Sequence, residues 1–126
     1  MQDRLLYEYA VLRLVPRVER AEFINIGVVL FCKRTDYLKC KIEVKSDRAL
    51  ALFPDLDLEN VACYLSAFEK IVAAHPEGGL IATYDAPSRF RWLTAKRSTI
   101  VQISAIHSGL SENLDATLSL LFNEFV

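Results

Sequence analysis

A short polar connection between two apolar stretches holds the first side chains that could do chemistry. Its carboxylates could supply acid/base or metal-ligand oxygens, and its guanidiniums could clamp an anion. The competing interpretation is a solvated turn with weak surface ion pairs. The connection covers residues 17–22, and its candidates are Arg17, Glu19, Arg20 and Glu22, with Arg13 of the preceding stretch as a further clamp for an anion.

Asn25 lies inside an otherwise apolar stretch that follows this connection. A buried amide must find hydrogen-bond partners, and Gly27, two residues later, leaves room for the close approach of a backbone or a ligand. We therefore consider two roles for Asn25: a ligand contact, or a side-chain clasp onto the neighbouring connection.

The segment from Ser88 to Ser98 has four cationic residues, two aromatic residues and no acid. Guanidiniums interleaved with aromatic rings are typical of sites that bind phosphates and unstacked bases, and they also suit an acidic protein surface. The alternative is an amphipathic segment whose rings dock on the core while its cations stay in water. The binding candidates in this segment are Arg89, Arg91, Trp92, Lys96, Arg97 and Ser98.

His107 is a further candidate, as a possible acid or base near pH 7 at the end of a predicted strand. A strand-end histidine satisfied by the backbone is the alternative. No GxSxG, GxxxxGK[ST], GxGxxG or HExxH motif occurs, and the chain has only two histidines and four glycines. We therefore predict no metal and no cofactor, and the catalytic residues, if any, stay unassigned.

Composition limits the class of protein. A chain of 126 residues is expected to form a single domain over residues 1–126, and its 15 basic and 16 acidic residues give no overall attraction to nucleic acid or membrane. The start of the chain has no apolar leader, and the longest apolar run, 26–32, is too short to cross a bilayer. Three cysteines without CxxC spacing are interpreted as small buried hydrophobes, which favours a cytoplasmic location.

The elements that position these residues begin with three predicted strands, over residues 7–15, 23–33 and 38–44. The second is apolar on both faces, so we expect it to lie inside the sheet, with Ile24, Ile26, Val28 and Leu30 on one side. The third alternates apolar and charged residues, which is typical of one buried face.

Later segments follow a different pattern. We expect a short helix capped by Ser46 and reaching about Phe53, a long amphipathic helix from Asp57 to about Val72, and a C-terminal helix capped near Asn113. Strands are predicted over 80–84 and 100–107, with a turn at 85–88. This order predicts an α+β fold: an antiparallel or mixed sheet of about five strands with the long helix and the C-terminal helix packed on it.

Two stretches, Tyr9–Arg13 with Pro16 and Glu22–Leu30, resemble the opening signature of the bacterial family catalogued as domain of unknown function 3037. Arg97–Ser98, His107 with Gly109, and the Leu-Leu-Phe near the end of the chain are also similar to it. The resemblance implies a small bacterial protein with no established activity. It also implies a toxin–antitoxin-like gene neighbourhood, in which such proteins are encoded beside a HipA-like kinase.

Two functional hypotheses follow. The first is an accessory or interaction protein without a catalytic motif, a partner or regulator of a HipA-like kinase, which binds through the basic and aromatic segment. The alternative is a phosphate-ligand or nucleic-acid binding protein, or an enzyme, whose cleft is formed by the 17–22 connection with Arg91, Arg97 and His107. We favour the first because no pairing of a nucleophile with a base is visible. The oligomeric state is not predicted.

Overall fold

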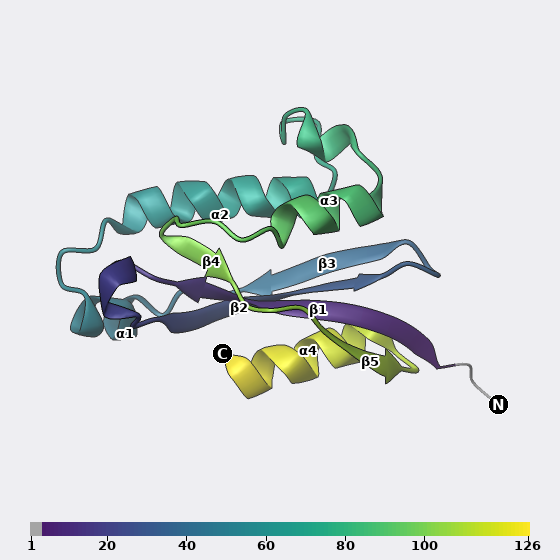
Figure 1. The fold of residues 1–126 in the computed structure, drawn as a ribbon, viewed down its shortest axis with the longest axis horizontal. Helices are drawn as coiled ribbons and strands as arrows, with labels where there is room; N and C mark the ends of the chain where they lie inside the picture. The colour runs from purple at the N-terminus through teal and green to yellow at the C-terminus, as the bar shows by residue number, and fades with distance from the viewer. Residues whose placement is uncertain (1–3) are drawn as a thin grey trace.

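A five-stranded antiparallel sheet forms the centre of the computed structural model, which describes residues 4–126 (Figure 1). Residues 1–3, part of the start of the chain that we expected to lack a leader, lie outside the described residues. The sheet order is β3-β2-β1, and both β4 and β5 pair with the far side of β1. The strands are β1 Leu5–Leu14, β2 Ile24–Cys32, β3 Tyr37–Ile42, β4 Val101–Ile103 and β5 His107–Ser111.

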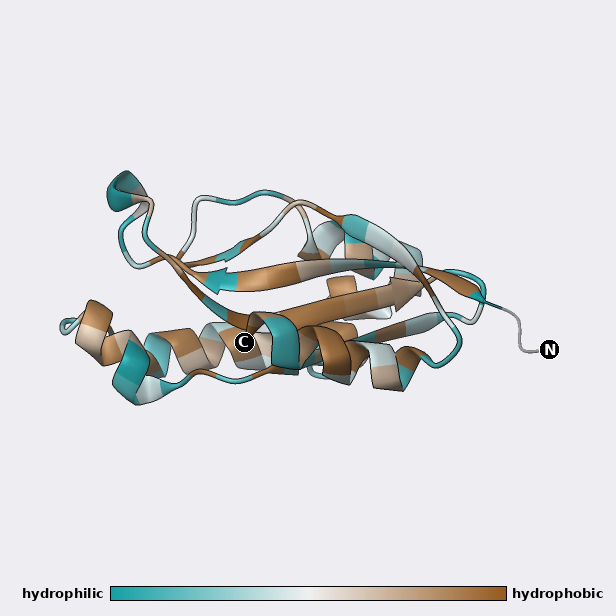
Figure 2. Ribbon diagram, turned by 90° about the horizontal axis from the view of Figure 1, so that it is seen from below, coloured by the Kyte–Doolittle hydropathy of each residue, from teal (hydrophilic) through white to brown (hydrophobic). Residues whose placement is uncertain are grey.

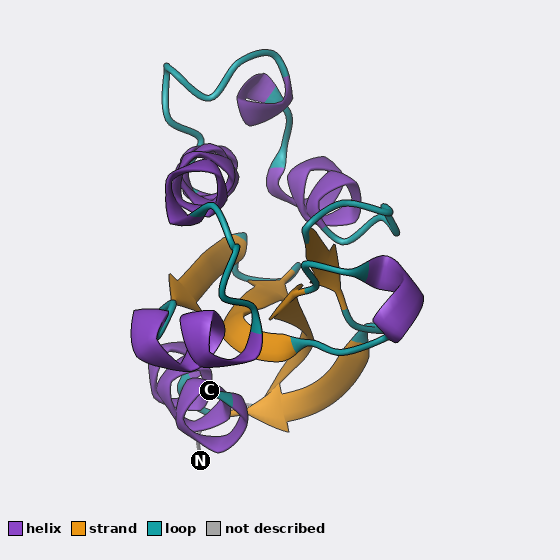
Figure 3. Ribbon diagram, turned by 90° about the vertical axis from the view of Figure 1, so that its left-hand side faces the viewer, coloured by secondary structure: helices purple, strands orange, loops and turns teal. Residues whose placement is uncertain are grey.

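Helices cover both faces of this sheet (Figure 3). The long helix α2 and helix α3 lie on one face, and the C-terminal helix α4 packs on the other, against β2 and β3. A short helix, α1, and the 3-10 turn η1 both lie at the same end of the sheet, on different sides of it (Figures 1 and 3). The bounds are α1 Ser46–Leu52, α2 Leu58–Val72, α3 Ala86–Leu93, α4 Leu114–Phe125 and η1 Val18–Arg20. The predicted α+β fold is confirmed.

Strand β2 is the central hydrophobic element, as its sequence predicts. Val28, Val29 and Leu30 are completely buried, and each such burial is worth roughly 1.5–3 kcal/mol. Val29 packs in the core under α2 and α3, whereas Val28 and Leu30 pack with α4. Figure 2 shows the apolar colour concentrated in the strands and along the helices that flank them.

The expected division of β2 into two faces is wrong in one respect. Ile24 and Ile26 face α2 and α3, but Val28 and Leu30 face α4. The cause is a β-bulge: Leu12 of β1 pairs with Gly27 and the next residue pairs with Asn25, so Ile26 is an extra residue in β2. One inserted residue reverses the alternation of side chains beyond it.

Helices α2 and α4 begin where the sequence predicts. The carboxylate of Asp57 accepts a hydrogen bond from the Asn60 amide at 3.2 Å, and the Asn113 side chain accepts one from the Ala116 amide at 3.1 Å. Both are N-cap contacts that satisfy a free amide of the first turn. Ser46, in contrast, is the first residue of α1 and not its cap, which is Lys45.

The region between α2 and β4 differs from the prediction. The expected strand over 80–84 is a 3-10 turn, η2 Ile81–Thr83, and the expected turn over 85–88 begins helix α3. Asp85 caps that helix by accepting from the Ser88 amide at 2.9 Å. A proline in the first turn is compatible with a helix because that position needs no amide donor, so Pro87 does not mark a turn here.

The predicted strand over 100–107 is divided into β4 and β5. At the break, the Ser104 hydroxyl accepts a hydrogen bond from the Val11 amide at 2.8 Å, and the Ser104 amide donates to the Val11 carbonyl at 2.9 Å. Ser104 therefore satisfies the backbone of β1 where the regular ladder stops. Among residues 4–126, no helix combines the length and the apolar character that a membrane span requires.

Candidate functional site

The connection of residues 17–22 forms the turn η1 between β1 and β2. Arg20 and Glu22 make an ion pair of 2.6 Å, with 53% and 34% of their side chains exposed. Arg17 and Arg20 also line a pocket of about 290 Å³ with Asp55, Asp57 and apolar neighbours. Acids and bases are therefore mixed at this pocket, and Glu19 is exposed outside its lining.

Arg13 and Asn25 lie directly opposite each other on β1 and β2. The Arg13 guanidinium lies over the Phe23 ring, with 4.4 Å from Cζ to the ring centroid. The Asn25 amide donates to the Phe125 carbonyl at 3.2 Å, near the end of α4, and not to the neighbouring connection, which was one of the two roles considered. Within residues 4–126, the buried Nε of Arg13 and Oδ1 of Asn25 have no hydrogen-bond partner.

The space beside Gly27 is occupied by the protein itself. A Cβ atom at this position would lie 2.9 Å from the Lys41 carbonyl oxygen and 2.9 Å from a side-chain carbon of Ile42. Gly27 therefore allows β3 to approach β2 closely, and this contact leaves no room for a ligand there.

Arg89 has a structural position although it belongs to the basic segment. Its Nη1 donates to the carbonyls of Ile71 at 3.0 Å and Val72 at 2.8 Å, at the end of α2, and its Nε donates to the Tyr84 carbonyl at 3.0 Å. The last carbonyls of a helix have no partner within the helix, so a guanidinium there satisfies them. Arg89 thereby joins α2 to α3.

The rest of the basic segment is at the surface. Trp92, at the end of α3, is 40% exposed, and the Arg97 guanidinium lies over its ring with 4.1 Å from Cζ to the centroid. Arg97 also donates to the Trp92 carbonyl at 2.5 Å. Arg91 and Lys96 are exposed beside this pair in the sequence. We call Arg91, Trp92, Lys96 and Arg97 the basic aromatic surface.

A hollow of about 340 Å³ adjoins this surface. It is lined by Lys96, Arg97 and Ser98 together with Gln102 and Ile103 of β4. Among residues 4–126, no Asp or Glu lines it. It is more cationic than the pocket of Arg17 and Arg20, whose lining includes Asp55 and Asp57.

His107 lies elsewhere. It is exposed at the start of β5, and its ring is 5.5 Å from that of Tyr9, which packs in the cluster under α4. Burial, followed by the charges of Tyr7 and Glu124, raises the pKa of Tyr9. Because α3 and α4 cover opposite faces, the structure separates His107 from Arg91 and Arg97. The pocket of Arg17 and Arg20 contains none of these three residues.

A comparison with known families identifies the chain. The profile of the family described as "Protein of unknown function (DUF3037)" matches residues 9–126 of the 126. The protein belongs to the DUF3037 family. No curated protein and no solved structure matches the chain. The resemblance seen in the sequence is thus confirmed.

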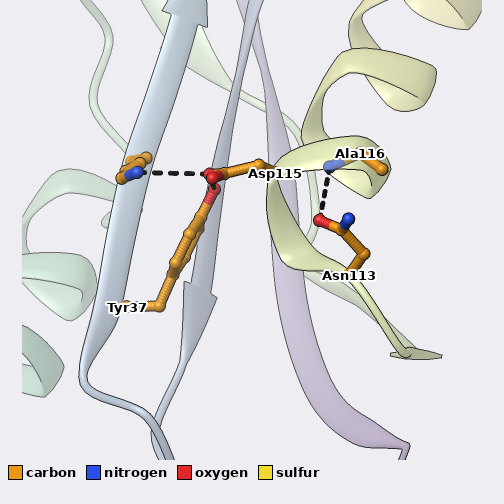
Figure 4. Close-up of polar contacts among 5 residues, drawn as sticks. Tyr37, Asn113, Asp115 and Ala116 are labelled. Atoms are coloured by element: carbon orange, nitrogen blue, oxygen red, sulfur yellow. Dashed lines mark hydrogen bonds and ion pairs between the residues drawn. The ribbon is translucent and has the colours of Figure 1, made fainter. Parts of the chain in front are cut away.

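The DUF3037 chain also has a polar cluster that the sequence analysis missed (Figure 4). The Tyr37 hydroxyl donates to Asp115 at 2.7 Å, and the Lys39 ammonium lies 3.2 Å from the same oxygen. Burial and this hydrogen bond raise the pKa of Tyr37, and the bonds from Tyr37 and Lys39 lower the pKa of Asp115. Asp115, an acid in the first turn of α4, could be noticed in the sequence. Its partners Lys39 and Tyr37 precede it by 76 and 78 residues, so the sequence did not indicate the cluster.

The three thiols of this family member differ in exposure. Cys32 is buried and Cys40 is half-buried, where burial and the charge of Glu69 raise its pKa to about 12. Cys63 is exposed on α2, so the interpretation of all three as buried hydrophobes is wrong for this residue. The polar face of an amphipathic helix explains its position. The part of the chain that the structure describes has no group of three potential metal-ligating side chains.

Proposed function

We propose that this DUF3037 protein is a noncatalytic accessory protein that binds another macromolecule through the basic aromatic surface. The observation that carries the proposal is an exposed Trp92 whose ring is held by the Arg97 guanidinium. Tryptophan and arginine dominate the binding energy of many protein interfaces. A ring already fixed by a cation loses little conformational freedom on binding.

The charge of the surrounding chain supports the same proposal. No Asp or Glu occurs from Ala86 to Ser111, although the whole chain has a formal charge of −1. Arg91 and Lys96 therefore contribute positive charge that has no acidic neighbour in this stretch. Such a surface favours a partner with an acidic face, through steering and charge complementarity.

The family resemblance supplies the partner that we propose to test first, a HipA-like kinase. In this proposal the kinase presents acidic residues around an apolar recess that accepts Trp92. The DUF3037 protein then acts as a binding partner or regulator and contributes no catalytic group.

The positions of the two histidines support a role without catalysis. His75 accepts a hydrogen bond from the Glu77 amide at 3.0 Å, and His107 packs against Tyr9. Neither contact pairs a histidine with a serine or cysteine nucleophile, which is a usual arrangement for acyl transfer through a covalent intermediate. The contacts that we find are those of a structural and a surface histidine.

The experiment is a binding titration of the purified full chain with the purified HipA-like kinase. Arg91→Glu reverses an exposed charge beside Trp92 and is expected to weaken binding at least tenfold, and added salt is expected to weaken wild-type binding. Lys33→Glu, an exposed cation in the β2–β3 turn, is the matched control and should bind like the wild type. Equal affinities for the wild type and both variants would remove the basic aromatic surface from the account.

The same variants test the nucleic-acid alternative. The wild type is titrated with single-stranded RNA and DNA oligonucleotides. We expect either no binding or a weak binding that the Arg91→Glu variant retains. If Arg91→Glu abolished oligonucleotide binding but left kinase binding intact, the proposal would be replaced by a nucleic-acid function.

A further inference from the structure

The two edges of the sheet differ in charge. Edge strand β3 carries Lys39 and Lys41, both exposed, and charged side chains on an edge oppose pairing with another chain. The opposite edge, formed by β4 and β5, has no Asp, Glu, Lys or Arg between Ser98 and Ser111. Within residues 4–126, β5 forms a ladder with β1 alone, so its outer backbone groups are free to pair.

Exposed apolar side chains lie beside this uncharged edge. Leu110 of β5 pairs directly with Leu6 of β1, and these side chains are 59% and 63% exposed. Ile106, just before β5, is 45% exposed. By the alternation along β1, Leu6 is on the same face as the buried Ala10 and Leu12, but α3 contacts β2 and β3 and leaves this corner uncovered.

We propose that β5 pairs antiparallel with β5 of a second copy of this chain, about a two-fold axis at Ser108. In this register Ile106 lies opposite Leu110 of the second copy, and the same pair repeats across the axis. Each copy therefore supplies both halves of the apolar contact, as an isologous interface requires. The two sheets become one continuous sheet of ten strands, five from each copy.

Charge complementarity selects a second copy over an unrelated strand. The same register places Glu112 opposite Ser104 of the second copy, two residues from Gln102. The hollow that contains Lys96 and Arg97 is lined by Gln102 and Ile103 as well. Ile103 pairs with Leu12 and Leu110 pairs with Leu6, so Ile103 and Leu110 lie on the same face of the sheet, toward which Glu112 also points by alternation from Leu110. Within its own chain, Glu112 has a loose ion pair with Arg4, at 4.0 Å and with both side chains more than half exposed. In the dimer, Glu112 of one copy therefore lies at the hollow of the other copy that contains Lys96 and Arg97.

The interface consists of one short strand and its flanking side chains, so it belongs to the small class of interfaces. We therefore expect association that depends on concentration in the micromolar range. Sedimentation equilibrium of the full chain should show an average mass that rises from 14.3 kDa towards twice that value as concentration increases.

Leu110→Lys places a charge on the edge and should keep the protein monomeric at every concentration, with an unchanged melting temperature. The matched control is Leu120→Lys, which puts the same charge at a 68% exposed leucine on α4 and should dimerise like the wild type. A wild type that stays monomeric at several hundred micromolar would overturn the proposal. Dimerisation of Leu110→Lys with wild-type affinity would overturn it as well.

Cross-linking tests the register. In a Cys63→Ser background, Ser108→Cys should form a disulfide-linked dimer on mild oxidation, because directly opposed residues in antiparallel strands have Cα atoms about 4.5–5.5 Å apart. Leu110→Cys alone should not cross-link, since its two copies would lie about 13 Å apart along the strands. The reverse result would exclude an axis at Ser108.

A charge exchange tests the second copy independently. Glu112→Lys should weaken dimerisation, and adding Lys96→Glu to it should restore the wild-type affinity. Failure of the second change to restore dimerisation would exclude this contact. Leu110→Lys should still bind the kinase through Arg91 and Trp92, so failure of the dimer and failure of the proposed function give different results.

Discussion

Two arginines of one helix turn show how position decides the role of a residue. Arg89 donates three hydrogen bonds to backbone carbonyls, whereas Arg91 is exposed and available to a partner. The sequence marks both as binding candidates because both belong to a stretch with four cations and no acid. The carbonyls that distinguish them belong largely to another helix, and their positions depend on how α2 and α3 pack.

Asp115 gives a prediction at the residue scale. Its pKa is below the ordinary value of 3.8 because Tyr37 and Lys39 donate to its carboxylate. A lowered pKa in the folded state stabilises the protein above the unfolded pKa, near 3.9, and this contribution is lost as the pH falls through the folded pKa. Asp115→Asn should therefore melt below the wild type at pH 7, and the difference should narrow by pH 3.

The measurement is the melting temperature of both proteins across this pH range. Glu19→Gln, which removes an exposed carboxylate in η1, controls for the change in net charge and should show a smaller difference at pH 7. If the melting temperatures of the wild type and Asp115→Asn differed by the same amount at pH 7 and at pH 3, the result would contradict the role of the carboxylate.

At the scale of elements, the fold class, the central position of β2, and helices α2 and α4 could be predicted from hydrophobic periodicity and caps. The bulge at Ile26 could not, because it depends on how β2 pairs with Leu12 and Arg13. The turn η2 resembles a strand only because its residues are apolar or β-branched. For the candidate site, the exposure of Trp92 and the separation of His107 depend on which face each helix covers.

Arg89 supplies the prediction at this scale, since it connects α2 to α3. Arg89→Ala leaves the carbonyls of Ile71, Val72 and Tyr84 without their donor. Losing hydrogen bonds from a charged donor should lower the free energy of unfolding by about 2 kcal/mol. Denaturant titration measures this, with Arg91→Ala as the control, which should change stability by less than about 0.5 kcal/mol. Equal stability of the two variants would show that the hydrogen bonds of Arg89 do not hold α2 and α3 together.

At the scale of the whole molecule, two surfaces are assigned to different contacts. The β5 edge is proposed for a second copy, and the end of α3 for a partner protein. Lys96 and Arg97 lie between them, at the hollow that β4 shares. A dimer would therefore present two copies of Arg91 and Trp92, so a partner with two sites would bind with increased avidity.

Trp92→Ala, measured for both stability and kinase binding, tests the central claim most directly. Trp92 is 40% exposed, so the variant should lose only about 1 kcal/mol of stability, against roughly 3–5 kcal/mol for a core aromatic. Kinase binding should weaken by about 2 kcal/mol, near thirtyfold. Leu120→Ala, at an exposed position on α4, is the control and should bind like the wild type. Wild-type affinity in a folded Trp92→Ala variant would contradict the account.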